Sequence, residues 1–376
     1  MILDYETLRV IWWLLLGVLL IGFAIMDGFD LGVAILLPGI ARNDDERRIL
    51  INSIGPTWEG NQVWFILGGG AIFAAWPDLY ALSFSGFYLA MLLILLALIL
   101  RPVGFKYRSK LPNRHWRSLW DWALFIGGFV PTLIFGVAIG NVLQGVPFNI
   151  DDNLRPFYTG TFWALLNPFA LLCGFVSIFM IVMQGAGFLM IKTESVLQQR
   201  AQKVHTITSL ILVALFALGG IYLYLGVDGY ILSSVLLHDG PSNPLYKTVT
   251  PQSKAWFENY KQFPLTMIIP ALGLLMPLFS ILLQKRAALA FLCSSIAIAS
   301  IIASVGVSMF PFILPSSSNP AHSLMVWDSS SSHTTLFIML IATVLLLPIV
   351  LVYTAWVYRV LRGKVNLETL RNESAY

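Results

Sequence analysis

Long apolar runs separated by short polar or basic stretches form the main pattern of this chain. The runs at 79–100 and 334–356 contain no charged residue. An α-helix rises about 1.5 Å per residue, so roughly 20 apolar residues cross the ~30 Å hydrocarbon core of a bilayer. The pattern therefore predicts an all-α, polytopic membrane protein.

The apolar runs predict about nine transmembrane helices within a single integral membrane domain, 1–376. Their limits lie near 10–37, 54–75, 79–100, 119–141, 161–190, 206–226, 264–284, 287–311 and 334–358. Prolines are expected to mark helix ends at Pro38, Pro77 and Pro147. Pro270 and Pro277 fall inside the seventh span and predict a kink. Two four-helix bundles plus one peripheral helix fit this number of spans.

Composition agrees with a membrane location. Hydrophobic residues make up 57% of the chain and charged residues 11%, against about 25% charged residues in soluble domains. The formal net charge is +4, but the basic residues lie between spans, so topology explains them better than nucleic acid does. Asp4 and Glu6 stand where a cleavable signal peptide would be basic, so we expect the first span to be retained.

The placement of lysine and arginine predicts the orientation in the membrane. Eighteen of the 23 basic residues, Arg371 in the C-terminal tail among them, lie in stretches that follow odd-numbered spans. The opposite side holds five: Arg9, Arg155, Lys247, Lys254 and Lys261. Because basic residues accumulate on the cytoplasmic side, we expect the N-terminus outside and the C-terminus in the cytoplasm.

Two segments on the predicted outer side are long, 227–262 and 312–333. Both are rich in polar residues and proline. A solvated cap over the helix ends is one interpretation, and a docking surface for a partner protein is the other. The sequence leaves both open.

Carboxylates inside the predicted spans are the strongest functional signal, because an ionised group in hydrocarbon is costly. Asp27 and Asp30 share one face of the first helix, and Glu59 lies near the start of the second span. Counted from the inner helix ends, Asp30 is about 10 Å deep and Glu59 about 8 Å. We therefore expect the three acids at similar depth, with Asn61 and Gln62 extending the polar track outward.

Two roles fit these acids. Closely spaced buried carboxylates share protons, which suits a relay that takes up protons from the cytoplasm. Alternatively, they form a buried hydrogen-bonded cluster that fixes the packing of two helices, with Arg101 as counter-ion. Asp121, at the predicted start of the fourth span, favours a capping or interface role.

Histidine and cysteine positions argue against a haem or metal bound by this chain. Membrane haems commonly use His or Met as axial ligands. The histidines all fall in predicted loops or at span ends: His115, His205, His238, His322 and His333. Methionine ligands stay open. Cys173 and Cys293 lie in apolar runs without metal-binding spacing, and no hydrolase or ATP-binding motif is present.

Each of two further patterns has an ordinary structural interpretation and a more specific functional one. Trp58 beside Arg101 suits a quinone headgroup, whereas tryptophan near a helix end usually belongs to the interfacial belt. Gly68-Gly69-Gly70 favours close helix packing, and a narrow passage for a small gas is the sharper alternative.

Seven motifs spread along the chain carry a family resemblance. They are GFDLG at 28–32, WEGNQVW at 58–64, GGAIFAAWP at 69–77, FSGFY at 84–88, RPVGF at 101–105, GNVLQGVPF at 140–148 and MFPFILPSS at 309–317. Together they resemble subunit II of cytochrome bd-type ubiquinol oxidases over nearly the whole chain.

The resemblance implies a complex that oxidises quinol and reduces oxygen to water in a bacterial cytoplasmic (inner) membrane. It places the b-type and d-type haems and the quinol-oxidising loop in partner subunit I, so this chain would supply no catalytic residue and no metal ligand. Small single-span accessory subunits are also compatible with it.

The resemblance also assigns residues. Asp27, Asp30 and Glu59 occupy the positions of acids that lead cytoplasmic protons inward, although relatives can have Asp where this chain has Glu59. Trp58 and Arg101 match the contacts of a structural quinone that some members hold.

The sequence thus favours a haem-free subunit II of a cytochrome bd-type quinol oxidase with a cytoplasmic proton-uptake path. A proton-coupled secondary transporter or channel is the alternative, and a purely structural scaffold is the third hypothesis. Haem and a partner subunit that copurify with the chain would separate the first two. Substitution of each acid within the intact complex would test the third.

Overall fold

The computed structural model describes residues 3–366, so Arg371 lies outside the described part. Helices dominate it. The α-helices are α1 (Tyr5–Ile40), α2 (Asp44–Ile54), α3 (Trp58–Asn61), α4 (Val63–Ala75), α5 (Pro77–Gly86), α6 (Tyr88–Tyr107), α7 (Arg114–Gln144), α8 (Pro168–Lys192), α9 (Ser195–Gly226), α10 (Glu258–Gln262), α11 (Ile268–Leu282), α12 (Ala287–Met309) and α13 (His333–Val360). Short 3-10 helices are η1 (Arg108–Lys110), η2 (Trp163–Leu165), η3 (Ala255–Phe257), η4 (Pro264–Met267) and η5 (Pro320–His322).

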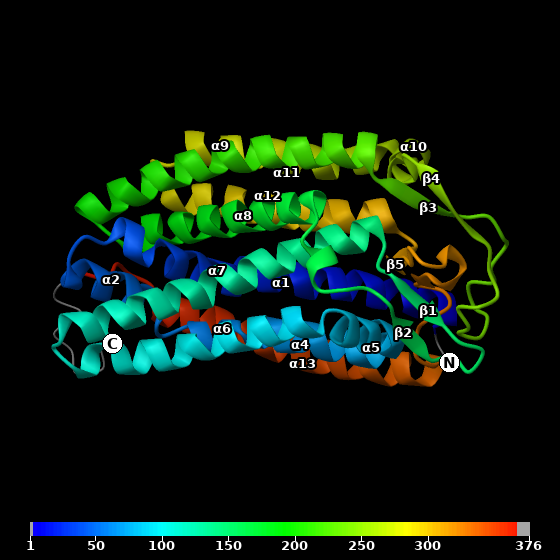
Figure 1. The fold of residues 1–376 in the computed structure, drawn as a ribbon. Helices are drawn as coiled ribbons and strands as arrows, with labels where there is room; N and C mark the ends of the chain where they lie inside the picture. Colours follow the sequence, from blue (N-terminus) through cyan, green and yellow to red (C-terminus); the bar gives the residue numbers. More distant parts are fainter. Residues whose placement is uncertain (1–2, 367–376) are drawn as a thin grey trace.

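Short strands pair only as antiparallel hairpins within the described chain. The pairs are β1 (Phe148–Ile150) with β2 (Pro156–Tyr158), β3 (Asp228–Leu232) with β4 (Val249–Ser253), and β5 (Phe312–Leu314) with β6 (Leu324–Met325). They gather at the end of the molecule where the N-terminus lies, while the C-terminus and α2 lie at the opposite end (Figure 1). The two predicted outer segments therefore contain folded hairpins.

Within residues 3–366, eight helices are long and apolar enough to cross a membrane, and nine if one bent pair counts as a single span. The first member of that pair is 58–75, which contains α3 and α4. The second is α5, and the two are bent by 119° at a short break. The predicted third span, 79–100, is divided between α5 and α6 at Phe87. This count confirms a polytopic all-α protein.

The long helices form two groups of four with one helix outside them. In one group α1 contacts α4 and α7, and α6 contacts α7; in the other, α8 and α11 each contact α9 and α12. Contacts of α8 with α1 and α7 join the groups, which lie one above the other in Figure 1. Among the long helices described, α13 makes its main contacts with α1 and α4. The arrangement matches the two predicted bundles and the peripheral helix.

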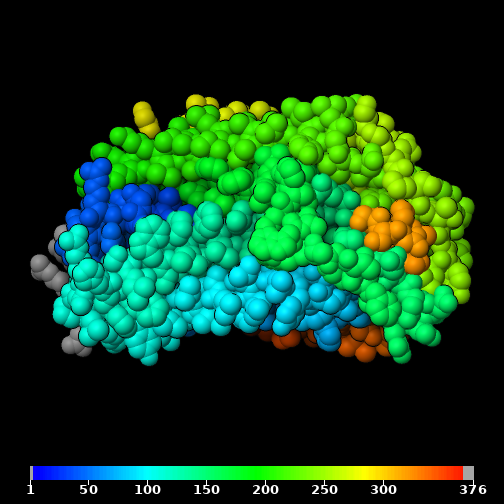
Figure 2. Space-filling model, in the orientation of Figure 1, coloured from blue at the N-terminus to red at the C-terminus, as the bar shows by residue number. Residues whose placement is uncertain are grey.

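α1 lies at the centre of the molecule. On the face shown in Figure 2 its neighbours cover most of it, and blue atoms are visible chiefly at the α2 end. Its contact with α8 is backbone to backbone, because a Cβ on Gly32 would lie 2.2 Å from the Ile181 carbonyl oxygen and one on Gly185 would lie 2.6 Å from Gly32. Small residues thus let the two bundles touch.

Several helix boundaries differ from the predicted spans. α6 continues to Tyr107 because Arg101, which seemed to end the span and was counted with the cytoplasmic loops, is buried inside the helix. α9 begins at Ser195. The predicted start near 206 was too late because the first turns of this helix are polar and do not look like a membrane span. Pro38 lies inside α1 rather than at its end. The predicted kink of the seventh span stays a prediction, with Pro277 inside α11.

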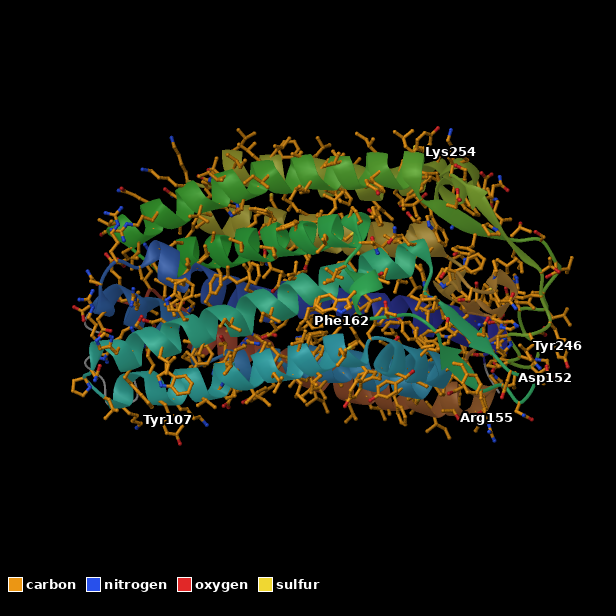
Figure 3. All side chains as sticks on the ribbon, in the orientation of Figure 1. Tyr107, Asp152, Arg155, Phe162, Tyr246 and Lys254 are labelled. Atoms are coloured by element: carbon orange, nitrogen blue, oxygen red, sulfur yellow. The ribbon has the colours of Figure 1, made fainter. Side chains whose placement is uncertain are left out.

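Charge is divided between the two ends of the molecule. Arg155 and Lys254 lie at the end with the strands, as Figure 3 shows, whereas Tyr107 at the end of α6 lies at the opposite end. α2, which contains Arg47 and Arg48 and follows Arg42, is also at that opposite end. This separation agrees with the charge asymmetry of the sequence.

Candidate functional site

A buried ion pair joins α1 to α6. Arg101 donates from Nη2 to Asp27 Oδ1 over 2.8 Å and from Nη1 to Asp27 Oδ2 over 3.1 Å. Both side chains are buried. Two parallel charge-assisted hydrogen bonds of this kind are strong and fix the mutual geometry. Arg101 is therefore the counter-ion that the packing interpretation expected.

Asp30, one turn further along α1, belongs to a second set of contacts. Asn61 of α3 donates from Nδ2 to Asp30 Oδ2 over 2.7 Å. The Tyr358 hydroxyl of α13 donates to Asn61 Oδ1 over 2.8 Å. Asn61 was predicted as part of the polar track, but Tyr358 was missed, because a tyrosine near the inner end of a span looks like an ordinary interfacial residue.

Three buried polar atoms of this centre have no hydrogen-bond partner within residues 3–366: Asp30 Oδ1, Arg101 Nε and Trp58 Nε1. Buried polar atoms are nearly always paired. The centre holds two carboxyl groups and one guanidinium, so in its fully ionised form it carries one net negative charge. Such a charge is costly in apolar surroundings, and one bound proton cancels it.

Trp58 and Arg101 lie together, as the sequence suggested. The Arg101 guanidinium carbon is 5.8 Å from the centroid of the Trp58 ring. The same ring stacks on Phe105 with centroids 5.1 Å apart and an interplanar angle of 25°. All three side chains are buried. They form an aromatic and cationic wall beside Asp27.

Glu59 does not join this buried centre. Its side chain is 65% exposed, and its carboxylate lies 3.8 Å from the Nζ of Lys106, which is 61% exposed. Neighbouring residues on a helix point about 100° apart, so the inward direction of Trp58 turns Glu59 outward. The structure brings together Asp27 and Asp30, and it places the third predicted acid on the surface of the chain.

A second ion network lies at the α2 end. Arg108 binds Asp121 at 2.5 Å and Asp44 at 2.9 Å. Arg47 also binds Asp121, at 2.7 Å, and Arg117 binds Asp44 at 2.6 Å. α7 begins about two turns before Asp121, so a capping role is wrong and an interface role is correct. The network ties α2 to the hairpin of α6 and α7.

His205 corrects the prediction that every histidine lies in a loop or at a span end. It is buried inside α9, where polar first turns hid the start of the helix. Nδ1 lies 3.0 Å from the Met183 carbonyl oxygen, and Nε2 lies 2.9 Å from Ser280 Oγ. The imidazole therefore links α9 to both α8 and α11.

Further polar side chains join α8 to α12 in the same bundle. Ser294 donates to Gln184 Oε1 over 2.6 Å, and Gln184 donates from Nε2 to Ser295 Oγ over 2.9 Å. All three are buried. These groups are neutral, unlike the acids and the arginine of the first bundle.

The outer segments form a folded cap over the start of α1. Arg9 of α1 donates to the carbonyl oxygens of His238, at 2.5 Å, and Gly240, at 2.9 Å. Lys247 lies 2.5 Å from Asp328, so the two outer segments are joined by a buried ion pair. Burial lowers the pKa of Lys247 and raises the pKa of Asp328. A role of this cap in docking stays a prediction.

Comparison with known proteins decides the family. The family described as cytochrome bd terminal oxidase subunit II matches residues 8–361. This chain belongs to that family. It is thus a subunit of a terminal oxidase, which is an oxidoreductase, and the numeral II implies a complex with a partner subunit.

Relatives match along nearly the full chain. Cytochrome bd-I ubiquinol oxidase subunit 2 of Escherichia coli (strain K12) is 51% identical over 374 residues, which cover 99% of each chain. Probable cytochrome oxidase subunit 2 of Haemophilus influenzae is 51% identical over 366 residues, 97% of each chain. Cytochrome bd ubiquinol oxidase subunit 2 of Bacillus subtilis is 30% identical over 361 residues, 96% of this chain and 97% of its own.

A solved structure supports the fold of this subunit II. The bd oxidase from Geobacillus thermodenitrificans contains a chain that matches with a TM-score of 0.62 and 14% sequence identity. The match covers 94% of this chain and 98% of that chain. At this identity the likeness concerns the fold alone.

Proposed function

We propose that this chain is the haem-free second subunit of a quinol oxidase that oxidises ubiquinol and reduces oxygen to water. A subunit I with b-type and d-type haems is its partner, in the inner membrane of a bacterium. Family membership and the names of the relatives at 51% identity support this proposal. The transporter alternative loses its support, since the acids that suggested it belong to an oxidase subunit.

Neither His205 nor His322 fits an axial haem ligand. His205, which lies within a bundle, has one ring nitrogen at Met183 and the other at Ser280. In the outer cap, His322 Nδ1 accepts a hydrogen bond from the Ile150 N–H, and its Nε2 lies 3.0 Å from Asn319 Nδ2. An axial nitrogen must be free to face the iron. These contacts favour ligation by the partner subunit.

The observation that carries a proton-uptake role is the unpartnered Oδ1 of Asp30 in a buried centre with one excess negative charge. A purely structural cluster would be expected to pair every buried oxygen. Asp27 is held in its pair with Arg101, so Asp30 is the carboxyl whose protonation neutralises the centre. A packing role explains the Asp27–Arg101 pair but not this oxygen.

Glu59 fits the outermost position of the same path. Its exposed carboxylate beside Lys106 suits a group that exchanges protons with water or with a partner surface. The Asn61 amide, two residues along the same short helix, binds Asp30. We therefore assign Glu59 to proton collection and Asp30 to proton binding inside, with Asp27 and Arg101 fixing the local charge.

The orientation follows the charge separation between the two ends. The end with α2 and C-terminal residues faces the cytoplasm, and the cap of hairpins faces outward. Protons taken up through Asp30 thus come from the cytoplasm. Labelling of single cysteines introduced at Lys110 and at Arg155 tests this, because only the second should react in intact cells.

Trp58 and Arg101 remain the proposed contact of a structural quinone. Trp58 Nε1 and Arg101 Nε are two buried donors without partners among the described residues, and a quinone carbonyl accepts such hydrogen bonds. Less quinone extracted per complex from Trp58→Phe would support this contact, and an unchanged content would remove it.

The test of the uptake path substitutes each acid in the purified complex with its partner. Asp30→Asn should lower quinol-driven oxygen consumption by about tenfold or more, because a buried proton carrier is lost. Glu59→Gln should have a smaller effect, since water reaches that position. Asp45→Asn, an exposed acid of α2, is the matched control and should leave turnover unchanged.

Two outcomes would decide against the path. Full turnover of Asp30→Asn at normal haem content would show a purely structural acid. Loss of haem bands in the reduced-minus-oxidised spectrum, with turnover per remaining haem unchanged, would show a role in assembly alone.

A further inference from the structure

α13 is attached to the rest of the molecule in an unusual way. Only 6% of the most apolar segment of this helix is buried. Leu336 is the one fully buried side chain among its described residues. Yet near its inner end Tyr358 reaches the most deeply buried polar centre of the neighbouring bundle. A helix that mostly faces lipid thus contributes a hydroxyl to the acids of α1.

Independent contacts fix the position of the Tyr358 ring. The ring meets Phe29 edge-on, with centroids 6.4 Å apart and an interplanar angle of 78°. Beyond it, Lys192 of α8 donates from Nζ to the Leu361 carbonyl over 2.6 Å, and the Val365 N–H donates to the Lys192 carbonyl over 2.8 Å. The end of α13 is therefore anchored at Tyr358 and just beyond it.

The chemistry of an amide explains what this hydroxyl does. Asn61 has one side that accepts and one that donates hydrogen bonds. By donating to Oδ1 at 2.8 Å, Tyr358 leaves Nδ2 to donate to Asp30 at 2.7 Å. In the reversed orientation the amide oxygen would face a carboxylate oxygen, and two acceptors repel.

We propose that Tyr358 is a positioning residue of the proton-uptake centre, whose hydroxyl holds the Asn61 amide in the orientation that donates to Asp30. The inference rests on the proposed proton-binding role of Asp30. The proton binds at the unpartnered Oδ1 of Asp30, so Asn61 donates to Oδ2 in both protonation states. This hydrogen bond is stronger when the carboxylate is ionised, and Tyr358 keeps the amide directed at it. The protonation state of Asp30 is thereby coupled to α13.

The alternative is a purely structural role, in which Tyr358 is an interfacial tyrosine that anchors α13 at the membrane surface. Tyr353 provides the matched control, since it lies on the same helix, is 63% exposed and packs on Trp356. An anchoring role predicts similar small effects of Tyr353→Phe and Tyr358→Phe on the amount of complex and none on pH dependence.

The experiment measures quinol-driven oxygen consumption against pH in the purified complex with its partner subunit. Tyr358→Phe should move the pH midpoint of turnover by about half a unit, as expected for loss of one hydrogen bond from a network around an ionised carboxylate. Tyr353→Phe should leave the midpoint in place. A wild-type midpoint in Tyr358→Phe overturns the inference.

Infrared difference spectra provide a readout that does not depend on turnover. The carbonyl stretch of protonated Asp30 is the band that disappears in Asp30→Asn, and it should shift in Tyr358→Phe. An unshifted band overturns the positioning role. If instead Asp30→Asn keeps full turnover and removes no band, the proposed uptake path itself fails, whatever Tyr358→Phe shows.

Discussion

The two helix bundles bury polar side chains of different kinds. In the first, Asp27, Asp30 and Arg101 lie together, and single atoms of Asp30 and Arg101 lack partners in the described chain. In the second, His205 bonds Ser280, and Gln184 bonds serines of α12. One centre carries charge, whereas the buried polar side chains of the other are neutral, including Ser209 of α9, whose hydroxyl has no partner in the described chain.

The difference separates function from packing. Neutral hydrogen bonds link helices at little cost in hydrocarbon. A buried ion pair gives little net stability, and apolar replacements of both partners are often neutral or stabilising. Stability therefore explains the polar contacts of the second bundle, but it does not explain why the first keeps a third ionisable group beside an ion pair. The proton-binding role proposed for Asp30 does.

Removal of Arg101 should break the first centre most severely. Arg101→Met leaves Asp27 and Asp30 buried without a cation, a change that costs about 3–5 kcal/mol in comparable pairs. We expect little assembled complex in membranes and a lower thermal midpoint of what is purified. Haem absorbance per milligram of membrane protein measures the first, and tryptophan fluorescence on heating measures the second.

A double variant distinguishes charge from packing. Arg101→Met combined with Asp27→Leu removes both partners, so assembly should recover in large part while turnover stays low. If the double variant is as unstable as Arg101→Met alone, the pair stabilises the fold and the comparison between the bundles fails.

Removal of His205 should have a smaller effect, on stability alone. In His205→Leu the Ser280 hydroxyl keeps its hydrogen bond to the Pro277 carbonyl, at 2.6 Å, so about 1–2 kcal/mol should be lost. Thermal midpoints measure this loss. Turnover per haem should equal that of the wild type, and a fall in turnover at normal haem content would make the second centre functional too.

Substitution of His322 should have the smallest effect, on the pH dependence of stability, and it extends the comparison to the outer cap. Its Nδ1 accepts from the Ile150 N–H at 2.9 Å, and burial together with Lys247 lowers the pKa of His322. The folded cap then binds fewer protons than the unfolded chain. Its stability is present above the ordinary histidine pKa of about 6.5 and declines as pH falls through the lowered folded pKa.

Thermal midpoints measured at neutral and mildly acidic pH check this sign. The wild type should lose more stability in acid than His322→Gln, whose amide oxygen accepts the same hydrogen bond without titrating. Equal losses in both proteins would assign the pH dependence to other groups.

The helices were predictable because uncharged apolar runs have few alternatives to membrane spans. The proximity of Asp27 and Asp30 followed from helical spacing, and Arg101 was correctly considered as a counter-ion. The contact between Asp30 and Asn61 agrees with residue counts along their helices. Direction around a helix was not predictable, which is why Glu59 was expected beside the other two acids.

Other features depended on contacts across the chain. His205 was misplaced because a polar start conceals where α9 begins. Tyr358 contacts Asn61, which is 297 residues away in the sequence, and no local sequence pattern predicts such a contact. Single-residue periodicity indicates which positions are buried, but the partner of a polar group is decided by packing between distant helices.

The link from α13 to Asn61 has a consequence for biogenesis. α13 is the last long helix of the described chain to leave the ribosome, so the earlier helices enter the bilayer while the Asn61 amide still lacks its tyrosine. The orientation of that amide is settled only when the final segment inserts. Completion of the acid centre therefore reports that translation has reached the end of the helical array, and a nascent chain stalled before α13 carries the acids without the group that directs them.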